Sequence, residues 1–259
     1  MDARKARALH DMGFTVWVRR SDAAVEAAVP GSIGSGDSSE RIIALATDTT
    51  TARGNEPVGG TASAPDIPRA TDESPDWAAL EAAVAACTRC ALAGGRKRTV
   101  FGVGARDARW LLVGEAPGAE EDRRGEPFVG RAGKLLDAML AALGLGRDEV
   151  FITNIVKCRP PGNRDPKPEE AASCRGYLDR QIEWVAPKLI LALGRVAAQQ
   201  LLGVEAPVGR MRGRAHEGPN GVPVVVTYHP AYLLRTPIAK RKVWEDLKLA
   251  LATVAPRAS

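Results

Sequence analysis

The sequence has few cysteines and histidines and no long apolar run. Its 259 residues include four cysteines and three histidines. No stretch of about 18 apolar residues occurs, which argues against a membrane-spanning helix. Residues 1–20 are charged and lack an apolar segment followed by a small-residue cleavage site, so we expect no secretory signal. These absences favour a cytoplasmic protein with no membrane association, in which disulfides are rare.

The charge is distributed unevenly along the chain. Residues 1–75 carry 8 Lys/Arg and 11 Asp/Glu, whereas residues 76–259 carry 28 and 20. A basic surface attracts polyanions, so nucleic acid is one possible partner of the second part. An excess of this size is equally typical of a protein that is merely soluble. Charge alone leaves both interpretations open.

The composition divides the chain into three parts. Residues 1–20 are a short N-terminal segment with a helical pattern over residues 2–12. Residues 21–75 are dominated by Gly, Ser, Thr, Pro and Ala and have few large side chains to bury, which predicts a disordered linker. Residues 76–259 combine apolar runs with amphipathic stretches, as a packed domain does. No internal repeat is present.

The apolar pattern of residues 76–259 predicts an α/β fold. Four short apolar runs, at residues 110–113, 150–153, 189–193 and 222–227, are typical of buried strands. Helical patterns occur at residues 76–86, 131–143, 168–185, 195–202 and 240–254. Strands that are apolar throughout and alternate with helices indicate a parallel sheet covered on both faces. Ligands of such sheets bind beyond the carboxyl ends of the strands.

The four cysteines form a pattern suited to a metal centre. Cys87 and Cys90 are a C-x2-C pair, and Cys158 and Cys174 follow after gaps of 67 and 15 residues. Two thiolates from the pair and two from the later cysteines complete a four-ligand site. The spacing fits zinc and a [4Fe–4S] cluster equally well. Four buried free thiols are the structural alternative.

Two motifs follow the first predicted strand. The turn Gly114-Glu115-Ala116-Pro117-Gly118 allows close approach of the backbone to a ligand and places a carboxylate at a strand end. Pro127-Phe128-Val129-Gly130 offers an aromatic ring, which is either core or a stacking platform for a flat base. The acidic run at residues 120–122 is interpreted as a solvated face.

Two further motifs follow the second and fourth predicted strands. Asn154 carries both a donor and an acceptor, which can bind the edge of a pyrimidine, although Asn is also common in turns. Asn163 lies in the stiff basic loop that follows. His229 is the one histidine at a predicted strand end, where it can donate to a developing oxyanion. A histidine in such a position is otherwise often satisfied within the core.

These residues together resemble the type-4 uracil-DNA glycosylases of bacteria and archaea, in order and in spacing. The resemblance covers about residues 78–255. It is carried by Cys87-x2-Cys90, Gly114-Glu-Ala-Pro-Gly118, Pro127-Phe-Val-Gly130, Thr153-Asn-Ile-Val-Lys-Cys158-Arg-Pro-Pro-Gly-Asn163-Arg, Cys174, Leu193-Gly194 and His229-Pro-Ala-Tyr-Leu-Leu234. It implies a three-layer αβα sandwich with a central four-stranded parallel sheet. It also implies a [4Fe–4S] cluster held by the four cysteines.

The resemblance implies a reaction and roles for the motif residues. The protein would flip uracil out of single- or double-stranded DNA and hydrolyse its N-glycosidic bond, as a monomer in base excision repair. Phe128 would stack on uracil, Asn154 would bind its O4/N3 edge, the Glu115–Ala116 backbone would contact the base, and His229 would stabilise O2. Glu115 and Asn163 are candidates for handling the attacking water. Leu233, Leu234 and Arg235 are candidates for filling the gap that the base leaves.

One position separates this chain from the type-1 enzymes. Type-1 uracil-DNA glycosylases have an Asp where this chain has Ala116, so the usual water-orienting carboxylate is missing. Two other functions stay open from the residues alone. One is a redox-sensing or nucleic-acid-binding module in which the cluster is the functional element. The other is a zinc-stabilised α/β enzyme that acts on a nucleotide instead of DNA.

Overall fold

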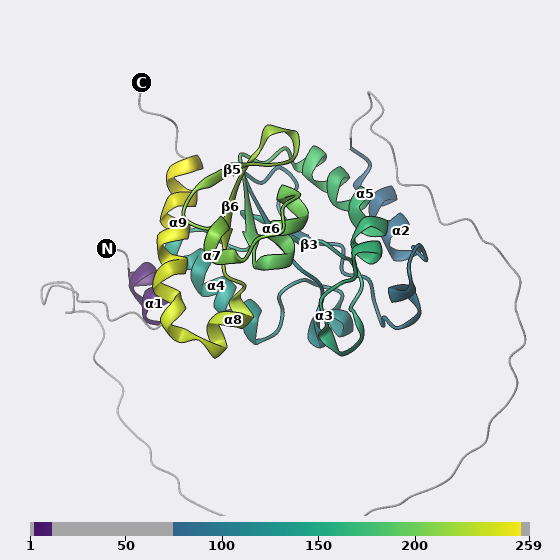
Figure 1. The fold of residues 1–259 in the computed structure, drawn as a ribbon, viewed down its shortest axis with the longest axis horizontal. Coiled ribbons are helices and arrows are strands. Elements are labelled where there is room, and N and C mark those ends of the chain that lie inside the picture. Colours follow the sequence, from purple (N-terminus) through teal and green to yellow (C-terminus); the bar gives the residue numbers. More distant parts are fainter. Residues whose placement is uncertain (1–2, 12–74, 255–259) are drawn as a thin grey trace, which may run out of the picture. The chain divides into compact units, whose positions relative to one another are not determined.

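The computed structural model describes residues 3–11 and 75–254 (Figure 1). The helix predicted over residues 2–12 is α1 (Ala3–Asp11). The linker predicted over residues 21–75 lies outside the described residues, apart from residue 75, so it stays a prediction. No helix within the described ranges is long and apolar enough to cross a membrane.

The centre of the fold is a mixed six-stranded sheet with the order β1-β3-β2-β4-β6-β5. Its four inner strands are parallel and correspond to the four predicted runs: β2 (Trp110–Gly114), β3 (Phe151–Asn154), β4 (Leu189–Leu193) and β6 (Pro223–Thr227). In register, Leu112 lies opposite Ile152 on one side and Leu191 on the other. The α/β class and the parallel four-stranded centre are confirmed.

Two short edge strands were not predicted. β1 (Val103–Gly104) pairs antiparallel with β3, and β5 (Ala215–Glu217) pairs antiparallel with β6. Neither is a buried apolar run, because each lies at an edge of the sheet with its side chains partly or fully exposed. Runs of two or three such residues carry no periodic signal.

Helices cover both faces of the sheet, which gives the predicted three layers (Figure 1). The reason is visible along β2, where Leu111 and Val113 join one apolar cluster and Trp110 and Leu112 the other. The helices whose buried side chains join the first cluster are α2 (Trp77–Ala85), α5 (Pro168–Val185), α6 (Arg195–Leu202) and α7 (Val208–Met211). Those of the second cluster are α1, α4 (Arg131–Leu143), α8 (Pro230–Arg235) and α9 (Lys240–Val254).

The remaining elements are short and lie in the connections. They are α3 (Ala119–Arg124) and the 3₁₀ turns η2 (Ala91–Gly94), η3 (Pro161–Asn163), η4 (Pro219–Gly221) and η5 (Pro237–Ala239). The long helices match their predicted ranges to within one residue at each end. Asp76 explains where α2 begins, because its Oδ1 accepts from the Ala79 amide at 2.9 Å.

The topology brings the predicted motifs together at the carboxyl ends of the parallel strands. β2 lies between β3 and β4, so the chain leaves β2 toward one side and crosses back to the other side through α5. Crevices at such reversals, beyond the carboxyl ends of the strands, are where α/β proteins bind ligands. Asn154 closes β3, and Glu115 and Gly194 directly follow β2 and β4. His229 lies two residues beyond the end of β6.

Candidate active site

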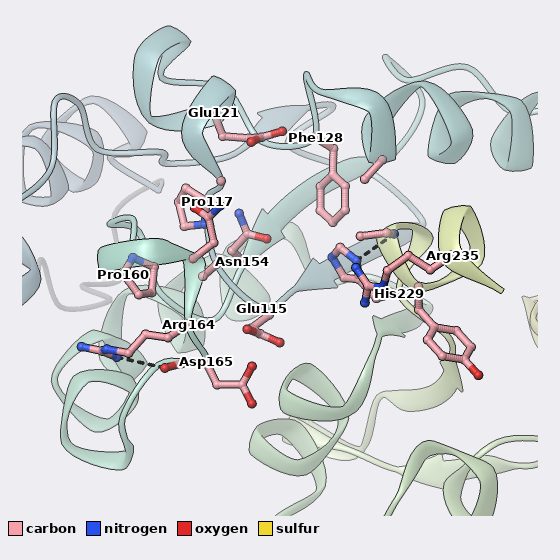
Figure 2. A pocket seen from close by; sticks show the side chains of 16 residues that line it. Glu115, Pro117, Glu121, Phe128, Asn154, Pro160, Arg164, Asp165, His229 and Arg235 are labelled. Carbon is pink, nitrogen blue, oxygen red and sulfur yellow. Dashed lines mark hydrogen bonds between the residues drawn. The ribbon is translucent and has the colours of Figure 1, made fainter. Parts of the chain in front are cut away.

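A cavity of about 420 Å³ opens at the carboxyl ends of the parallel strands. Figure 2 shows Phe128, Asn154 and His229 pointing toward a common space, with Glu115 beside it. All six predicted uracil-site and water-handling residues line this cavity: Glu115, Ala116, Phe128, Asn154, Asn163 and His229. They come from four separate connections of the fold, so their convergence is a property of the tertiary structure.

The backbone around Phe128 is fixed by hydrogen bonds to two side chains, Glu121 and Arg147. Phe128 has a φ of 54°, which is unusual for an aromatic residue. Glu121 accepts from the Val129 and Gly130 amides at 3.0 Å each. From the other side, Arg147 donates to the Phe128 carbonyl at 3.3 Å. These contacts stabilise the strained conformation that directs the ring into the cavity.

Asn154 ends β3 with its side-chain amide at the cavity. It is only 2% exposed, and its Oδ1 is buried without a hydrogen-bond partner. Its backbone carbonyl accepts from the Lys157 ammonium at 2.9 Å. That ammonium is itself buried and also donates to Thr153 and Gln181, both at 2.6 Å. The backbone of Asn154 is therefore fixed, while its buried acceptor lacks a donor.

Gly114 leaves room for both of these side chains. A Cβ at this position would lie 2.4 Å from Asn154 Oδ1 and 2.6 Å from Phe128 Cζ. Contacts under 3 Å do not occur between real atoms of these types without displacement. The first glycine of the Gly114–Gly118 turn is therefore a packing requirement of the cavity.

His229 presents a neutral ring to the cavity. Its Nδ1 accepts from the Ala231 amide at 3.1 Å, which leaves the ring proton on Nε2. Burial, and secondly the charge of Arg235, lower the pKa of His229 to about 4. Its ring stacks on Phe128, with centroids 5.5 Å apart and planes at 29°. At neutral pH the site therefore offers an uncharged N–H donor in a fixed orientation.

Glu115 and Asp165 are two carboxyl groups that line the cavity. Burial, and secondly the nearby charge of Asp165 and a hydrogen bond with it, raise the pKa of Glu115 to about 7. Arg195 makes an ion pair with Asp165 and acts in the opposite direction on Glu115. A carboxyl group that titrates near neutrality is suited to proton transfer.

Asn163 and Ala116 take different places at the cavity wall. Asn163 is exposed, has a φ of 54°, and its Oδ1 accepts from Arg159 at 2.7 Å. Ala116 is half-buried and lies in the turn after β2, where it presents no acidic side chain to the cavity. Position 116 therefore supplies no carboxylate to the cavity, whereas Glu115 and Asp165 do.

Two expectations about neighbouring residues were wrong. Leu233 is fully buried in the core, so it is not available to enter DNA, whereas Leu234 is 39% exposed and Arg235 lines the cavity. The acidic run at residues 120–122 is also not simply a solvated face. Asp122 is buried and accepts from the Lys97 amide at 2.8 Å, and Glu121 holds the Phe128 loop.

The four cysteines line one small pocket away from the cavity. Cys87 and Cys90 follow α2, Cys158 follows β3, and Cys174 lies on α5. In the described part of the chain, no three His, Cys, Asp or Glu side chains are grouped as for a metal ion. The shared pocket and the all-sulfur donor set are the observations that fit a cluster.

Basic groups and amides surround these sulfurs. Arg96 donates to Cys158 Sγ at 3.3 Å, and the Lys157 amide donates to Cys174 Sγ at 3.3 Å. Burial raises the pKa of the Cys158 thiol to about 11, with Arg96 acting against it, and burial also raises that of Cys174. A thiol of raised pKa forms little of the nucleophilic thiolate, which argues against a reactive Cys158 or Cys174. Donors aimed at sulfur suit thiolates that carry charge onto a metal centre.

Comparison with known proteins identifies the family. Residues 101–248 match the family model of the uracil DNA glycosylase superfamily. A type-4 uracil-DNA glycosylase of Archaeoglobus fulgidus is 45% identical over 172 residues, which cover 64% of this chain and 86% of that protein. A type-4 enzyme of Thermotoga maritima is 45% identical over 167 residues, covering 63% and 87%. The chain belongs to the type-4 uracil-DNA glycosylase family.

Sequence patterns missed several residues of the site. Asp165 lies in the loop before α5 and Arg195 begins α6, 50 and 80 positions from Glu115, and nothing in the sequence indicates that they meet. Glu121 and Arg147, which clamp the Phe128 loop, have no local signal either. The charge pattern of α3, acidic in its first turn and basic in its last, indicates a helix but not the contact of Glu121 with residues 129 and 130.

Proposed function

We propose that the protein removes uracil from DNA by hydrolysing the bond between uracil N1 and deoxyribose C1′. The single observation that carries the proposal is the buried, unpaired Oδ1 of Asn154 in a cavity shared with Phe128 and His229. A buried acceptor without a donor is rare in folded proteins and indicates a missing ligand group. Membership in the type-4 family supports the same reaction.

Asn154 supplies the selectivity for uracil. Its Oδ1 accepts the uracil N3–H, and its amide nitrogen donates to O4. Cytosine reverses both groups, since it presents an acceptor at N3 and a donor at C4. Pairing cytosine with the same amide leaves buried polar groups unsatisfied, which costs about 1–3 kcal/mol for each group. Phe128 adds a stacking face for the flipped base, which offsets part of the cost of extrusion.

His229 stabilises the leaving base. As the C1′–N1 bond breaks, negative charge develops on uracil, in part on O2. The Nε2–H of neutral His229 donates to that oxygen, and burial of the ring keeps His229 neutral. Removal of one such donor typically lowers kcat about 10²–10³-fold.

Glu115 and Asn163 handle the attacking water. Glu115 takes one proton of the water as its oxygen bonds to C1′, and Asn163 orients the water through its side-chain amide. Type-1 enzymes orient the water with an Asp at the position of Ala116. In this chain the carboxylate of the preceding residue, Glu115, takes that role. The raised pKa of Glu115, about 7, makes it a stronger base than a solvated Glu.

Cys87, Cys90, Cys158 and Cys174 hold a [4Fe–4S] cluster in this proposal. The cluster, when bound, supplies a covalent link between the segment after α2 and the β3–α5 connection. Arg96 and the Lys157 amide donate to the sulfurs and offset their charge. That connection begins directly after Asn154 and contains Asn163, so a fixed cysteine site stabilises the uracil pocket.

The substrate is DNA, single- or double-stranded, and the protein acts as a cytoplasmic monomer. Arg164 and Arg235 line the cavity, where they are placed to contact phosphates that flank the flipped nucleotide. Leu234 is 39% exposed, and it occupies the space that the base leaves. Phosphate contacts made by these arginines weaken as salt rises.

Release of free uracil tests the proposed function directly. Anaerobically purified protein is incubated with an oligonucleotide that contains one uracil, and strand cleavage after alkali reports the abasic site. We expect uracil release without added metal and no release from the matched thymine or cytosine oligonucleotides. Intact uracil DNA after incubation with protein that contains iron would contradict the proposal.

A further inference from the structure

The loop between η3 and α5 places a second carboxylate, Asp165, in the lining of the cavity that also contains Glu115. Asp165 and Glu115 line the same cavity, and Figure 2 shows their carboxylates facing one another. Neither the sequence patterns nor the resemblance assigned a role to Asp165. It does not pair with the adjacent Arg164, whose guanidinium binds Glu170 at 2.7 and 2.8 Å.

Two contacts hold Asp165 in this position. Arg195, the first residue of α6, makes an ion pair with its carboxylate. Arg164 donates to its backbone carbonyl at 2.9 Å. Gly194, immediately before Arg195, has a φ of 97°, and a Cβ there would lie 3.0 Å from His229 Cβ. One turn therefore contacts His229 through Gly194 and anchors Asp165 through Arg195.

We infer that Asp165 is a positioning residue for the hydrolytic step, which acts through Glu115, with Arg195 as its anchor. The inference rests on the proposed function and deepens it. The water oxygen forms a bond to C1′ while the electron pair of the C1′–N1 bond leaves with uracil. One water proton passes to the Glu115 carboxylate, and the resulting Glu115 hydroxyl donates a hydrogen bond to Asp165.

The pairing has a definite electrostatic consequence. A negative charge beside a carboxyl group disfavours its ionised form, so Asp165 raises the pKa of Glu115 and makes it a stronger base. Arg195 limits this effect because its positive charge favours ionised Glu115. Removing Asp165 and removing Arg195 must therefore change the ionisation of Glu115 in opposite directions.

Of the other charged groups that line the cavity, Glu121 and Arg164 already have partners. On α3, Glu121 accepts from two backbone amides. In the loop before α5, Arg164 binds Glu170. His229, the residue before α8, is neutral at neutral pH, and the charge of Arg235, at the end of α8, acts on it. Asp165 raises the pKa of Glu115, and Arg195 lowers it.

The test is the pH dependence of single-turnover uracil release by the full chain. We expect wild-type activity to rise with pH through a midpoint near 7, because Glu115 must lose its proton to act as a base. Asp165→Asn lowers that midpoint by roughly half to one pH unit, and Arg195→Gln raises it by a similar amount. Asp165→Glu, which keeps the charge, restores the wild-type midpoint to within about 0.3 unit.

A matched pair elsewhere on the surface provides the control. Asp179 pairs with Arg175 at 2.6 Å on α5, away from the cavity, so Asp179→Asn leaves the midpoint unchanged. A role limited to folding would lower activity at every pH without opposite displacements. Midpoints that stay at the wild-type value in both variants, or that move in the same direction, would overturn the inference.

A second readout separates this inference from the proposed function. The pKa of Glu115 is measured by carbon NMR of its labelled carboxyl group in wild-type protein and in Asp165→Asn. A lower pKa in the variant supports the pair even in a protein that releases no uracil. An unchanged Glu115 pKa overturns the inference, whatever the glycosylase activity.

Discussion

At the scale of single residues, Asn154 is the side chain on which base selection depends. Its Oδ1 is buried without a partner, so the ligand must bring the donor. Asn154→Asp replaces the amide donor by a second acceptor, which repels O4 of uracil and accepts from the amino group of cytosine. We expect kcat/KM for uracil to fall and the preference for uracil over cytosine to shrink about 10–100-fold.

This prediction is measured with matched uracil and cytosine oligonucleotides. Asn220→Asp, which makes the same chemical change in the η4 turn, is the control and leaves both rates unchanged. Equal losses on both bases in the Asn154 variant would show that the amide only supports the fold. The preference ratio, and not the absolute rate, is therefore the decisive quantity.

The neutral state of His229 leads to a second residue-scale prediction. Because its pKa is about 4, His229 is uncharged throughout the range from pH 5 to 9 and adds no step to the activity profile there. His229→Ala lowers kcat roughly 10²–10³-fold with little change in the pH midpoint. His216→Gln, at a histidine bonded to the Met211 carbonyl, leaves kcat unchanged.

Nitrogen NMR of the His229 ring checks the physical reason. We expect the proton on Nε2 and an unprotonated Nδ1 at pH 7, as the Ala231 contact requires. The lowered pKa of His229 also determines how the stability of the fold changes with pH. Between about pH 4 and 6.5 the unfolded chain binds the proton more tightly, so this group makes the fold less stable as pH falls through that window. A doubly protonated ring at neutral pH would contradict this view.

At the scale of elements, the turn after β2 sets the size of the pocket. Gly114→Ala adds a methyl group within 2.6 Å of both Asn154 and Phe128, whose side chains must then move into the cavity. Because both contacts are with side-chain ends and not backbone, we expect the variant to fold. Its kcat/KM for uracil DNA should fall at least about tenfold, since displacements near 1 Å misalign reacting groups.

The control for this prediction is another glycine in a turn. At Gly95, no atom lies within 4 Å of the position that an added methyl group would take, and the backbone is not left-handed. Gly95→Ala therefore keeps full activity. Circular dichroism and thermal melting show whether each variant is folded. A Gly114→Ala protein with wild-type kcat/KM would mean that the pocket in solution is wider than the structure shows.

At the scale of the whole molecule, the cysteine site links parts of the chain that are distant in sequence. We expect anaerobically purified protein to be brown and to contain about four iron atoms per chain. Cys158→Ser removes a ligand, so the variant should lose most of its iron and melt roughly 10 °C lower. Ser173→Ala, beside Cys174, should keep both the iron and the melting temperature.

The same measurement distinguishes the remaining alternatives for this site. Colourless protein with zinc would point to a zinc centre with the same ligands. Protein without metal, together with unchanged stability in Cys158→Ser, would mean four buried thiols. We expect iron, because a [4Fe–4S] cluster is what the resemblance to the type-4 enzymes implies; the donors on the sulfurs fit either metal.

The sequence predicted the buried core of the fold better than it predicted the edge strands and the exposure of single side chains near the site. The four inner strands were predictable because each is buried on both faces and is apolar at nearly every position. The edge strands were not, because two or three half-exposed residues leave no pattern. Leu233 was misassigned because exposure of a residue in a short helix depends on what packs against it, and α8 packs that side chain into the core.

The sequence by itself determined the fold class, the order of strands and helices, the family motifs and the composition of the cysteine set. These depend on local periodicity and on residue types, which are written along the chain. Only the tertiary structure decided that Phe128, Asn154 and His229 share one cavity, that Glu121 and Arg147 clamp the Phe128 loop, and that Asp165 faces Glu115. Such contacts join residues tens of positions apart, and their energies arise only when the parallel sheet brings its strand ends together.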